Sequence, residues 1–130
     1  MKDCIFCNIV KNNTPHHEIW WSDESHIAFL DANPTQRGHT LVIPRKHSEN
    51  ILNLDDGEYS DFLLASKKVA EKMRRFFGNE RIAMVIEGLS VDHTHIHLVP
   101  IKQKGDLGPF PKYATSPAEQ SEIGAKLRNS

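Results

Sequence analysis

Three histidines alternate with other residues in the segment His93–His97, and the chain continues from there as a short apolar run. In a β-strand, alternate side chains point to the same face. The pattern therefore predicts a strand over residues 93–101 with three imidazoles on one face and Thr94, Ile96 and Leu98 on the other. Such a strand belongs in a sheet whose apolar face is covered by other elements.

The outer two imidazoles would lie about 13 Å apart along this strand, since each residue advances the chain by about 3.3 Å. Two neighbouring histidines could share a metal ion but all three could not, so we expect their roles to differ. An imidazole can itself be a nucleophile, and it attacks phosphorus well near neutral pH because much of it is unprotonated. The other imidazoles could then hold phosphate oxygens or pass a proton to the leaving group.

Periodicity and turn residues predict the other elements of the sheet. Strands are expected over residues 18–21, 26–30, 39–44 and 81–87, with tight turns at 22–25 and at Gly88 and a loop over 31–38. Five strands joined mostly by short connections favour an antiparallel sheet covered by helices, which is an α+β fold.

One long helix is expected from Asp55 to Gly78, because apolar residues recur there at three- and four-residue steps between an aspartate cap and a glycine stop. A last helix should begin at Ser116, with Pro117 and Glu119 completing a capping-box pattern. A short helix or turn is expected over residues 4–10 and a loop over 102–115. We interpret residues 1–130 as one domain with its core in 1–101 and a C-terminal loop and helix in 102–130.

Composition excludes several classes of protein. The formal net charge is −1, so we expect no broad cationic surface and no nucleic-acid partner, and the basic run from Lys67 to Arg75 is interpreted as the solvated face of the long helix. No run approaches the roughly 18 apolar residues of a membrane span, and the N-terminus does not resemble a signal peptide. Two cysteines in such a chain suggest a reducing compartment, so a cytoplasmic location is expected.

The pair Cys4-x-x-Cys7 has the spacing of zinc ligands, but it supplies only two of the four ligands of a tetrahedral site. A redox pair is a weaker interpretation, because no β-α-β pattern surrounds it. Two buried cysteines without a chemical role are the remaining alternative.

Three blocks of the sequence together resemble the histidine triad (HIT) family over about three quarters of the chain. They are the segment Cys4-Ile5-Phe6-Cys7, the block Ala28-Phe29-Leu30-Asp31 with Gly38-His39-Thr40-Leu41-Val42-Ile43-Pro44-Arg45-Lys46-His47, and the triad His93-x-His95-x-His97 followed by two apolar residues. The resemblance implies a nucleotide hydrolase or transferase that works through a covalent nucleotidyl-histidine. It also implies a five-stranded antiparallel sheet with one long and one or two shorter helices, and often a homodimer.

The resemblance assigns roles to particular residues. His95 would be the nucleophile, His97 would bind the α-phosphate and His39 would stand beside it. Ser90 would contact the phosphate or the leaving group, and Asp31 would hold the ribose hydroxyls, although Asp31 could also be simply a turn residue. The apolar wall of the base pocket would comprise Ile5, Phe6, Ile9 and Phe29, for which an ordinary core position is the alternative.

The resemblance also completes the candidate metal site, since His47 and His93 would join Cys4 and Cys7 around a structural zinc ion. No organic cofactor is expected. The sequence departs from the family pattern before the triad, where Leu89 replaces a common glutamine and Glu87 adds a negative charge. Both changes disfavour long polyphosphate substrates.

We therefore expect a hydrolase that cleaves a nucleoside 5′-phosphoryl bond, in a phosphoramidate or a dinucleoside polyphosphate, with a purine nucleotide as substrate. A nucleotide-binding module with little turnover would use the same residues. A purely structural zinc protein would leave His39, His95 and His97 unexplained.

Overall fold

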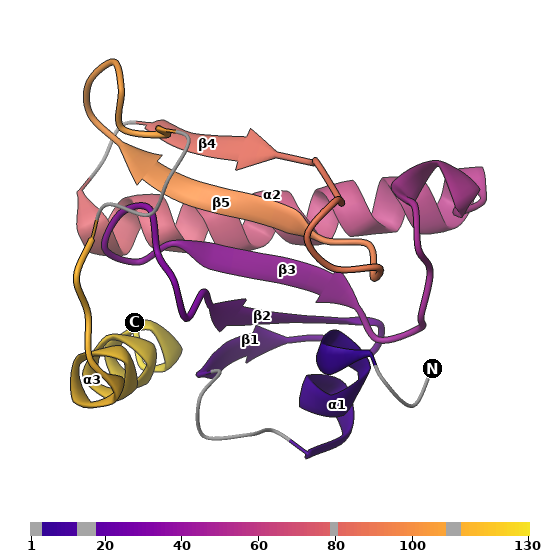
Figure 1. The fold of residues 1–130 in the computed structure, drawn as a ribbon, viewed down its shortest axis with the longest axis horizontal. Coiled ribbons are helices and arrows are strands. Elements are labelled where there is room, and N and C mark those ends of the chain that lie inside the picture. Colours follow the sequence, from indigo (N-terminus) through magenta and orange to yellow (C-terminus); the bar gives the residue numbers. More distant parts are fainter. Residues whose placement is uncertain (1–3, 13–17, 79–80, 109–112) are drawn as a thin grey trace.

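The computed structural model describes residues 4–12, 18–78, 81–108 and 113–130. Within them the chain forms a five-stranded antiparallel sheet in the order β1-β2-β3-β5-β4 (Figure 1). The α+β fold expected from the sequence is confirmed. The strands are β1 (Ile19–Ser22), β2 (His26–Leu30), β3 (Thr40–Pro44), β4 (Arg81–Val85) and β5 (Ile96–Ile101), and the helices are α1 (Ile5–Asn12), the 3-10 helix η1 (Ile51–Asn53), α2 (Asp56–Phe77) and α3 (Pro117–Arg128).

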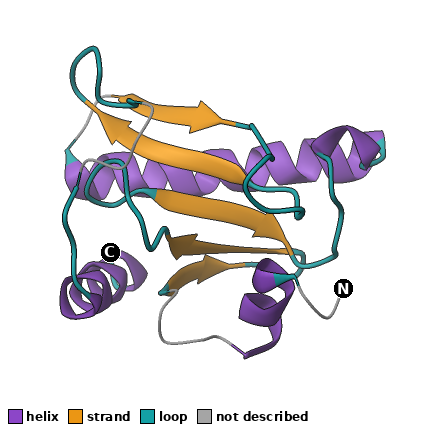
Figure 2. Cartoon of the chain, in the orientation of Figure 1, coloured by secondary structure: helices purple, strands orange, loops and turns teal. Residues whose placement is uncertain are grey.

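Helix α2 begins and ends where its capping residues require. The Asp55 carboxylate accepts a hydrogen bond from the backbone N–H of Glu58, whose carboxylate accepts one from the Asp55 N–H in return. Gly78 takes the left-handed conformation that stops the helix. Between these ends α2 runs along one face of the sheet (Figure 2). Its buried residues are Phe62, Ala65, Ser66, Val69 and Met73.

Two apolar clusters lie on the two faces of the sheet. Ala28 and Leu30 of β2 pack with α2 and α3, whereas the alternate residues Ile27 and Phe29 pack with α1. Every residue of β2 is therefore buried. Covering on both faces explains why this strand reads as a continuous apolar run in the sequence rather than an alternating one.

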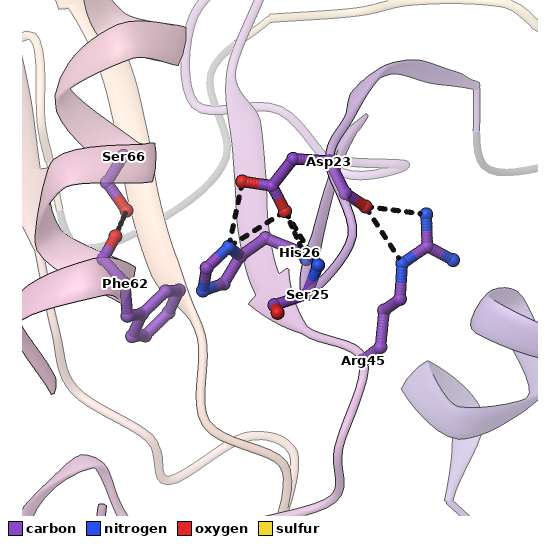
Figure 3. A network of polar contacts seen from close by, with 6 residues as sticks. All are labelled: Asp23, Ser25, His26, Arg45, Phe62 and Ser66. Atoms are coloured by element: carbon purple, nitrogen blue, oxygen red, sulfur yellow. Dashed lines mark hydrogen bonds and ion pairs between the residues drawn. The ribbon is translucent and has the colours of Figure 1, made fainter. Parts of the chain in front are cut away.

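The turn between β1 and β2 is tied to two other elements by Asp23 (Figure 3). One carboxylate oxygen of Asp23 accepts hydrogen bonds from the backbone N–H groups of Ser25 and His26 and lies 3.0 Å from Nδ1 of the His26 ring. Burial would raise the pKa of Asp23, but these hydrogen bonds outweigh it and lower the pKa. The Arg45 guanidinium donates to the Asp23 carbonyl, and the His26 ring stacks on Phe62. The turn is thereby held to the end of β3 and to α2.

The structure corrects the strand that was expected over residues 93–101. Strand β5 begins only at Ile96 and β4 ends at Val85, so a long connection replaces the tight turn expected at Gly88. The backbone before β5 bonds elsewhere: the Thr94 N–H donates to the Ser48 carbonyl at 2.6 Å instead of to a strand. His93 and His95 therefore lie outside the sheet, and strand alternation does not place them.

The C-terminal region adds a helix beyond the sheet. Ser116 caps α3 as expected, and α3 packs against β1, β2 and α2. The expected loop over 102–115 is irregular in its described parts, and residues 109–112 lie outside the described residues. Gln120 of α3 donates to the Asp31 carbonyl at 2.9 Å, so this region holds the loop after β2.

No helix in the described part of the chain is long and apolar enough to cross a membrane.

Gly38, in the loop between β2 and β3, provides a test of how that loop packs against α2. It has φ +88°, and a Cβ atom built on it would lie 2.3 Å from the Phe77 ring. Gly38→Ala should therefore lower the free energy of unfolding by roughly 2 kcal/mol, measured by denaturant titration. Gly57→Ala in α2 is the matched control, because its Cβ would meet only ordinary contacts at 3.5 Å. Equal effects of the two substitutions would contradict the packing described.

Candidate functional site

A cavity of about 670 Å³ opens on the sheet face that carries α1, opposite α2. Its floor is a row of cross-strand partners: Phe29 pairs with Leu41, Leu41 with His97, and His97 with Val85. His97 therefore divides the floor into a part on β2 and β3 and a part on β4. The expected separation of His97 from Ile96 and Leu98, which pack on the α2 side, is observed.

His95 reaches the cavity from the connection before β5 and is only 2% exposed. Its Nδ1 lies 2.6 Å from the backbone carbonyl of His93. A carbonyl can only accept, so Nδ1 carries the proton and, in the neutral ring, Nε2 keeps a lone pair. Among the described residues this Nε2 is a buried side-chain atom without a hydrogen-bond partner. The ring is set edge-on to Phe6, with centroids 5.2 Å apart.

A chain of hydrogen bonds fixes the neighbouring imidazoles. The backbone N–H of Thr35 donates to Nδ1 of His39 at 3.0 Å, so the proton of neutral His39 is on Nε2. That Nε2 lies 3.0 Å from Nδ1 of His97 and donates to it. His97 consequently carries its own proton on Nε2, where it can be donated to a ligand.

Both of these histidines are uncharged at neutral pH. Burial lowers the pKa of His39 to about 4. Burial, with the neighbouring His39 and His95 rings, lowers the pKa of His97 to about 4, although Asp31 and Glu87 oppose the shift. The pair therefore offers a neutral donor to the cavity.

The residues expected at the base and ribose are brought together, with one difference. Ile5, Phe6 and Phe29 line the cavity, but Ile9 is 1% exposed and lies in the apolar cluster with Phe6 and Phe29. Asp31 lines the cavity, and its carboxylate accepts the N–H of Asn33, so it is a turn residue and a cavity residue at once. Ser90 also lines the cavity.

Beside this cavity, Cys4, Cys7, His47 and His93 form one cluster whose potential ligand atoms all lie within 4.8 Å of one another. Nδ1 of His93 lies 3.4 Å and 3.5 Å from the sulfurs of Cys4 and Cys7, and Nδ1 of His47 lies 3.3 Å from the Cys7 sulfur. Zinc bonds of about 2.3 Å to sulfur and about 2.0 Å to nitrogen at a tetrahedral angle give S···N separations of roughly 3.5 Å. The donor set and its spacing therefore fit a zinc ion.

A hydrogen bond from the His93 ring to the backbone of Pro44 supports this fit. Nε2 of His93 lies 2.9 Å from the Pro44 carbonyl and donates to it, which leaves Nδ1 unprotonated toward the two sulfurs.

A second group, Asp31, His39 and His97, also has ligand atoms within 4.8 Å of one another. It suits a metal less well, because the bond from Thr35 places a proton on Nε2 of His39, the nitrogen that faces the other two residues.

Thr35, Leu107 and Gln120 are among the contributors to the site that sequence reasoning missed. Thr35 acts through its backbone N–H, which no side-chain pattern announces. Leu107 lines the cavity from the segment after β5, which reads as a plain loop. Gln120 was not distinguished from the other polar residues of its helix. Its burial, at 8% exposed, is a tertiary property that the narrow apolar stripe of α3 does not reveal.

Relatives of the chain share its sequence over most of its length. The profile of the HIT domain matches residues 11–104. An uncharacterized HIT-like protein of Borreliella burgdorferi is 39% identical over 107 residues, which cover 77% of this chain and 76% of that protein. A Schizosaccharomyces pombe protein named adenosine 5′-monophosphoramidase is 36% identical over an alignment of 132 residues, with 95% of each chain covered.

Solved structures agree with this relationship. A HIT-like protein from Bartonella henselae superposes with a TM-score of 0.81 at 28% identity, over 99% of this chain and 97% of that one. A zinc-bound histidine triad family protein from Mycobacterium smegmatis gives a TM-score of 0.82 at 25% identity, over 98% and 92% of the two chains. The chain with its buried His95 and its His39–His97 pair thus belongs to the HIT domain family.

Proposed function

We propose that this protein is a hydrolase that cleaves a nucleoside 5′-phosphoryl bond through a covalent nucleotidyl-His95 intermediate. The observation that carries the proposal is the state of His95: Nδ1 is committed to the His93 carbonyl, and the partnerless Nε2 belongs to a residue that lines the cavity. A buried lone pair without a partner is costly for the fold and is what an attacking nitrogen requires. The name of the fission yeast relative, an adenosine 5′-monophosphoramidase, agrees with this chemistry.

In the first step Nε2 of His95 forms a bond to the α-phosphorus while the bond to the leaving group breaks. With a phosphoramidate, the nitrogen takes up a proton from solvent before it departs, so the leaving group is a neutral amine. His95 then carries a positive charge, which the His93 carbonyl stabilises through the short Nδ1 hydrogen bond. In the second step water attacks phosphorus and releases one proton to solvent, the bond from phosphorus to Nε2 breaks, and His95 leaves as a neutral imidazole together with a nucleoside monophosphate.

His97 would hold the phosphate during both steps. Its Nε2–H faces away from His39 and can donate to a phosphate oxygen as charge builds there. His39 is a positioning residue in this scheme, because its bonds to Thr35 and His97 set the tautomer of His97.

The nucleoside would lie over the β2 and β3 part of the floor. Phe29 and Leu41 there, with Ile5 and Phe6 from α1, offer apolar surface to a base, and a purine fits such a wall. The Asp31 carboxylate at the same end can accept hydrogen bonds from ribose hydroxyls.

We propose that zinc is held by Cys4, Cys7, His47 and His93 in a structural role, since four protein ligands leave no position for substrate. The Mycobacterium smegmatis relative is zinc-bound, which supports the proposal. The ion would fix the His93 ring, and the carbonyl of the same residue orients His95.

The homodimer and the cytoplasmic location stay predictions. Strand β4 lies at the edge of the sheet, and Met84 and Ile86 there are each 44% exposed. An apolar edge of this kind favours pairing of two copies through β4.

Replacement of the nucleophile tests the mechanism. We expect His95→Ala to reduce hydrolysis of an adenosine phosphoramidate at least about a thousandfold, because the variant lacks the Nε2 atom on which the proposed intermediate forms. Mass spectrometry of protein quenched without acid should show a transient gain of one nucleotidyl group in the wild type and none in the variant. An unchanged thermal transition is the control for folding. A residual rate above a few per cent would rule out His95 as the nucleophile.

Metal analysis tests the zinc site independently of activity. Protein purified without chelator should contain about one zinc ion per chain, and Cys7→Ser should lower both that content and the melting temperature. Cobalt(II) reconstitution should give the absorption of thiolate ligation in the wild type. A metal-free protein with an unaltered melting temperature would count against the site.

The neutral His39–His97 pair predicts a pH dependence of stability. Each pKa is about 4 when folded, against about 6.5 unfolded, so between these values the unfolded chain binds more protons. The free energy of unfolding should therefore fall as the pH is lowered from about 6.5 to about 4. Denaturant titrations should show a smaller fall for His97→Asn, in which one of the two groups is gone. The same pH slope in both proteins would refute the assignment.

A further inference from the structure

The charges that line the cavity are all of one sign in the described part of the chain. Asp31 and Glu87 are its ionisable lining residues besides His95 and His97, and neither lysine nor arginine is among them. The described residues of this site that can donate to a nucleotide phosphate are uncharged. Any further negative charge on the substrate would be repelled by the carboxylates among the lining residues.

The two carboxylates belong to the two parts of the floor that His97 divides. Asp31 follows β2, on the side of Phe29 and Leu41, where the proposed function places the nucleoside. Glu87 follows β4, two residues after Val85, the cross-strand partner of His97 on the other side. Figure 1 shows β4 beside β5 on the side away from β3. With the nucleoside on the β2 and β3 side and the phosphate at His97, the leaving group would extend over β4.

The surface on the β4 side combines apolar side chains with one oriented acid. Val85 of β4 lines the cavity there, and Val99 of β5 lines it as well. One oxygen of the Glu87 carboxylate accepts a hydrogen bond from the Leu89 N–H at 2.9 Å, which fixes the direction of this exposed side chain. Glu87 also interacts electrostatically with His97, so its charge reaches the place where the phosphate would bind.

We infer that the β4 side, with Val85 and Glu87 next to Val99 of β5, is a subsite for an amine leaving group with an alkyl chain and a positive charge, and that Glu87 determines this preference. The inference rests on the proposed function. An alkyl chain would cover the apolar residues, and an ammonium group beyond it would pair with Glu87. A nucleotide or polyphosphate leaving group would place its anionic phosphates against the same carboxylate, so the subsite selects phosphoramidates over dinucleoside polyphosphates.

Three adenosine 5′-phosphoramidates of similar length test this inference. Their amines are 1,4-diaminobutane, n-pentylamine and 4-aminobutyrate, which give cationic, neutral and anionic leaving groups on the same kind of P–N bond. For the wild type, kcat/KM should fall in that order. A single exposed charge pair changes a rate constant by about twofold to fivefold, so the ratio of cationic to anionic substrate should exceed about fivefold.

Glu87→Gln should lower the ratio of kcat/KM for the cationic substrate to kcat/KM for the anionic substrate by at least about fivefold. Added salt should also lower this ratio in the wild type. Glu122→Gln is the matched control, because Glu122 lies on α3 and pairs with Lys126 on the surface. Its ratio should equal that of the wild type.

The outcomes separate the inference from the function on which it rests. Hydrolysis with a ratio that Glu87→Gln leaves unchanged, or a wild-type preference for the anionic substrate, would overturn the subsite and leave the hydrolase intact. If none of the three substrates is hydrolysed or forms an adduct on His95, the proposed function fails and the subsite fails with it.

Discussion

The hydrogen bond from Nδ1 of His95 to the backbone carbonyl of His93 is the contact on which the site depends. It leaves the lone pair on Nε2 of His95, and it joins the His95 ring through Nδ1 to His93, whose side chain lies in the Cys/His cluster. The ring of His93 bonds to the Pro44 carbonyl through Nε2 and faces the sulfurs of Cys4 and Cys7 through Nδ1. The same residue thus connects Cys7 of α1, the end of β3 and His95. The Cys/His cluster therefore includes the residue whose carbonyl orients His95 in the cavity.

The fold could be predicted well from the sequence, because its signals are local. The caps at Asp55, Gly78 and Ser116 depend on residues within a few positions of one another, and the structure has them where they were expected. Strand β2 was predicted to the residue, because turn residues bound its apolar run on both sides. The start of β5 was predicted wrongly, because the bond of Thr94 to Ser48 joins segments far apart in the chain.

The site shows the same division between local and long-range information. Alternation places only His97 in a strand, so the reasoning that put all three histidines on one strand face was wrong, although its conclusion that their roles differ agrees with the geometry. The resemblance to the HIT family, rather than periodicity, pointed to His39 and Asp31. It also added His47 and His93 to Cys4 and Cys7, whose spacing had suggested a metal site. Gln120 and Thr35 could not be found in this way, because one acts through a buried contact with a backbone carbonyl and the other through its own backbone N–H.

The uncharged state of His39 and His97 explains how a cavity without a lysine or arginine among its described lining residues can suit a phosphate. A fixed cation would bind substrate and product phosphates alike, and such uniform binding does not lower the barrier between them. In the proposed reaction, a neutral imidazole donor held by its neighbours would gain most where negative charge builds on the phosphate oxygens. Burial of His39 and His97 keeps them in that neutral state, so the desolvation that disfavours their charged forms maintains the donor that the proposed chemistry would use. The cost to the fold of burying two imidazoles is limited because each satisfies a hydrogen bond of the other or of Thr35.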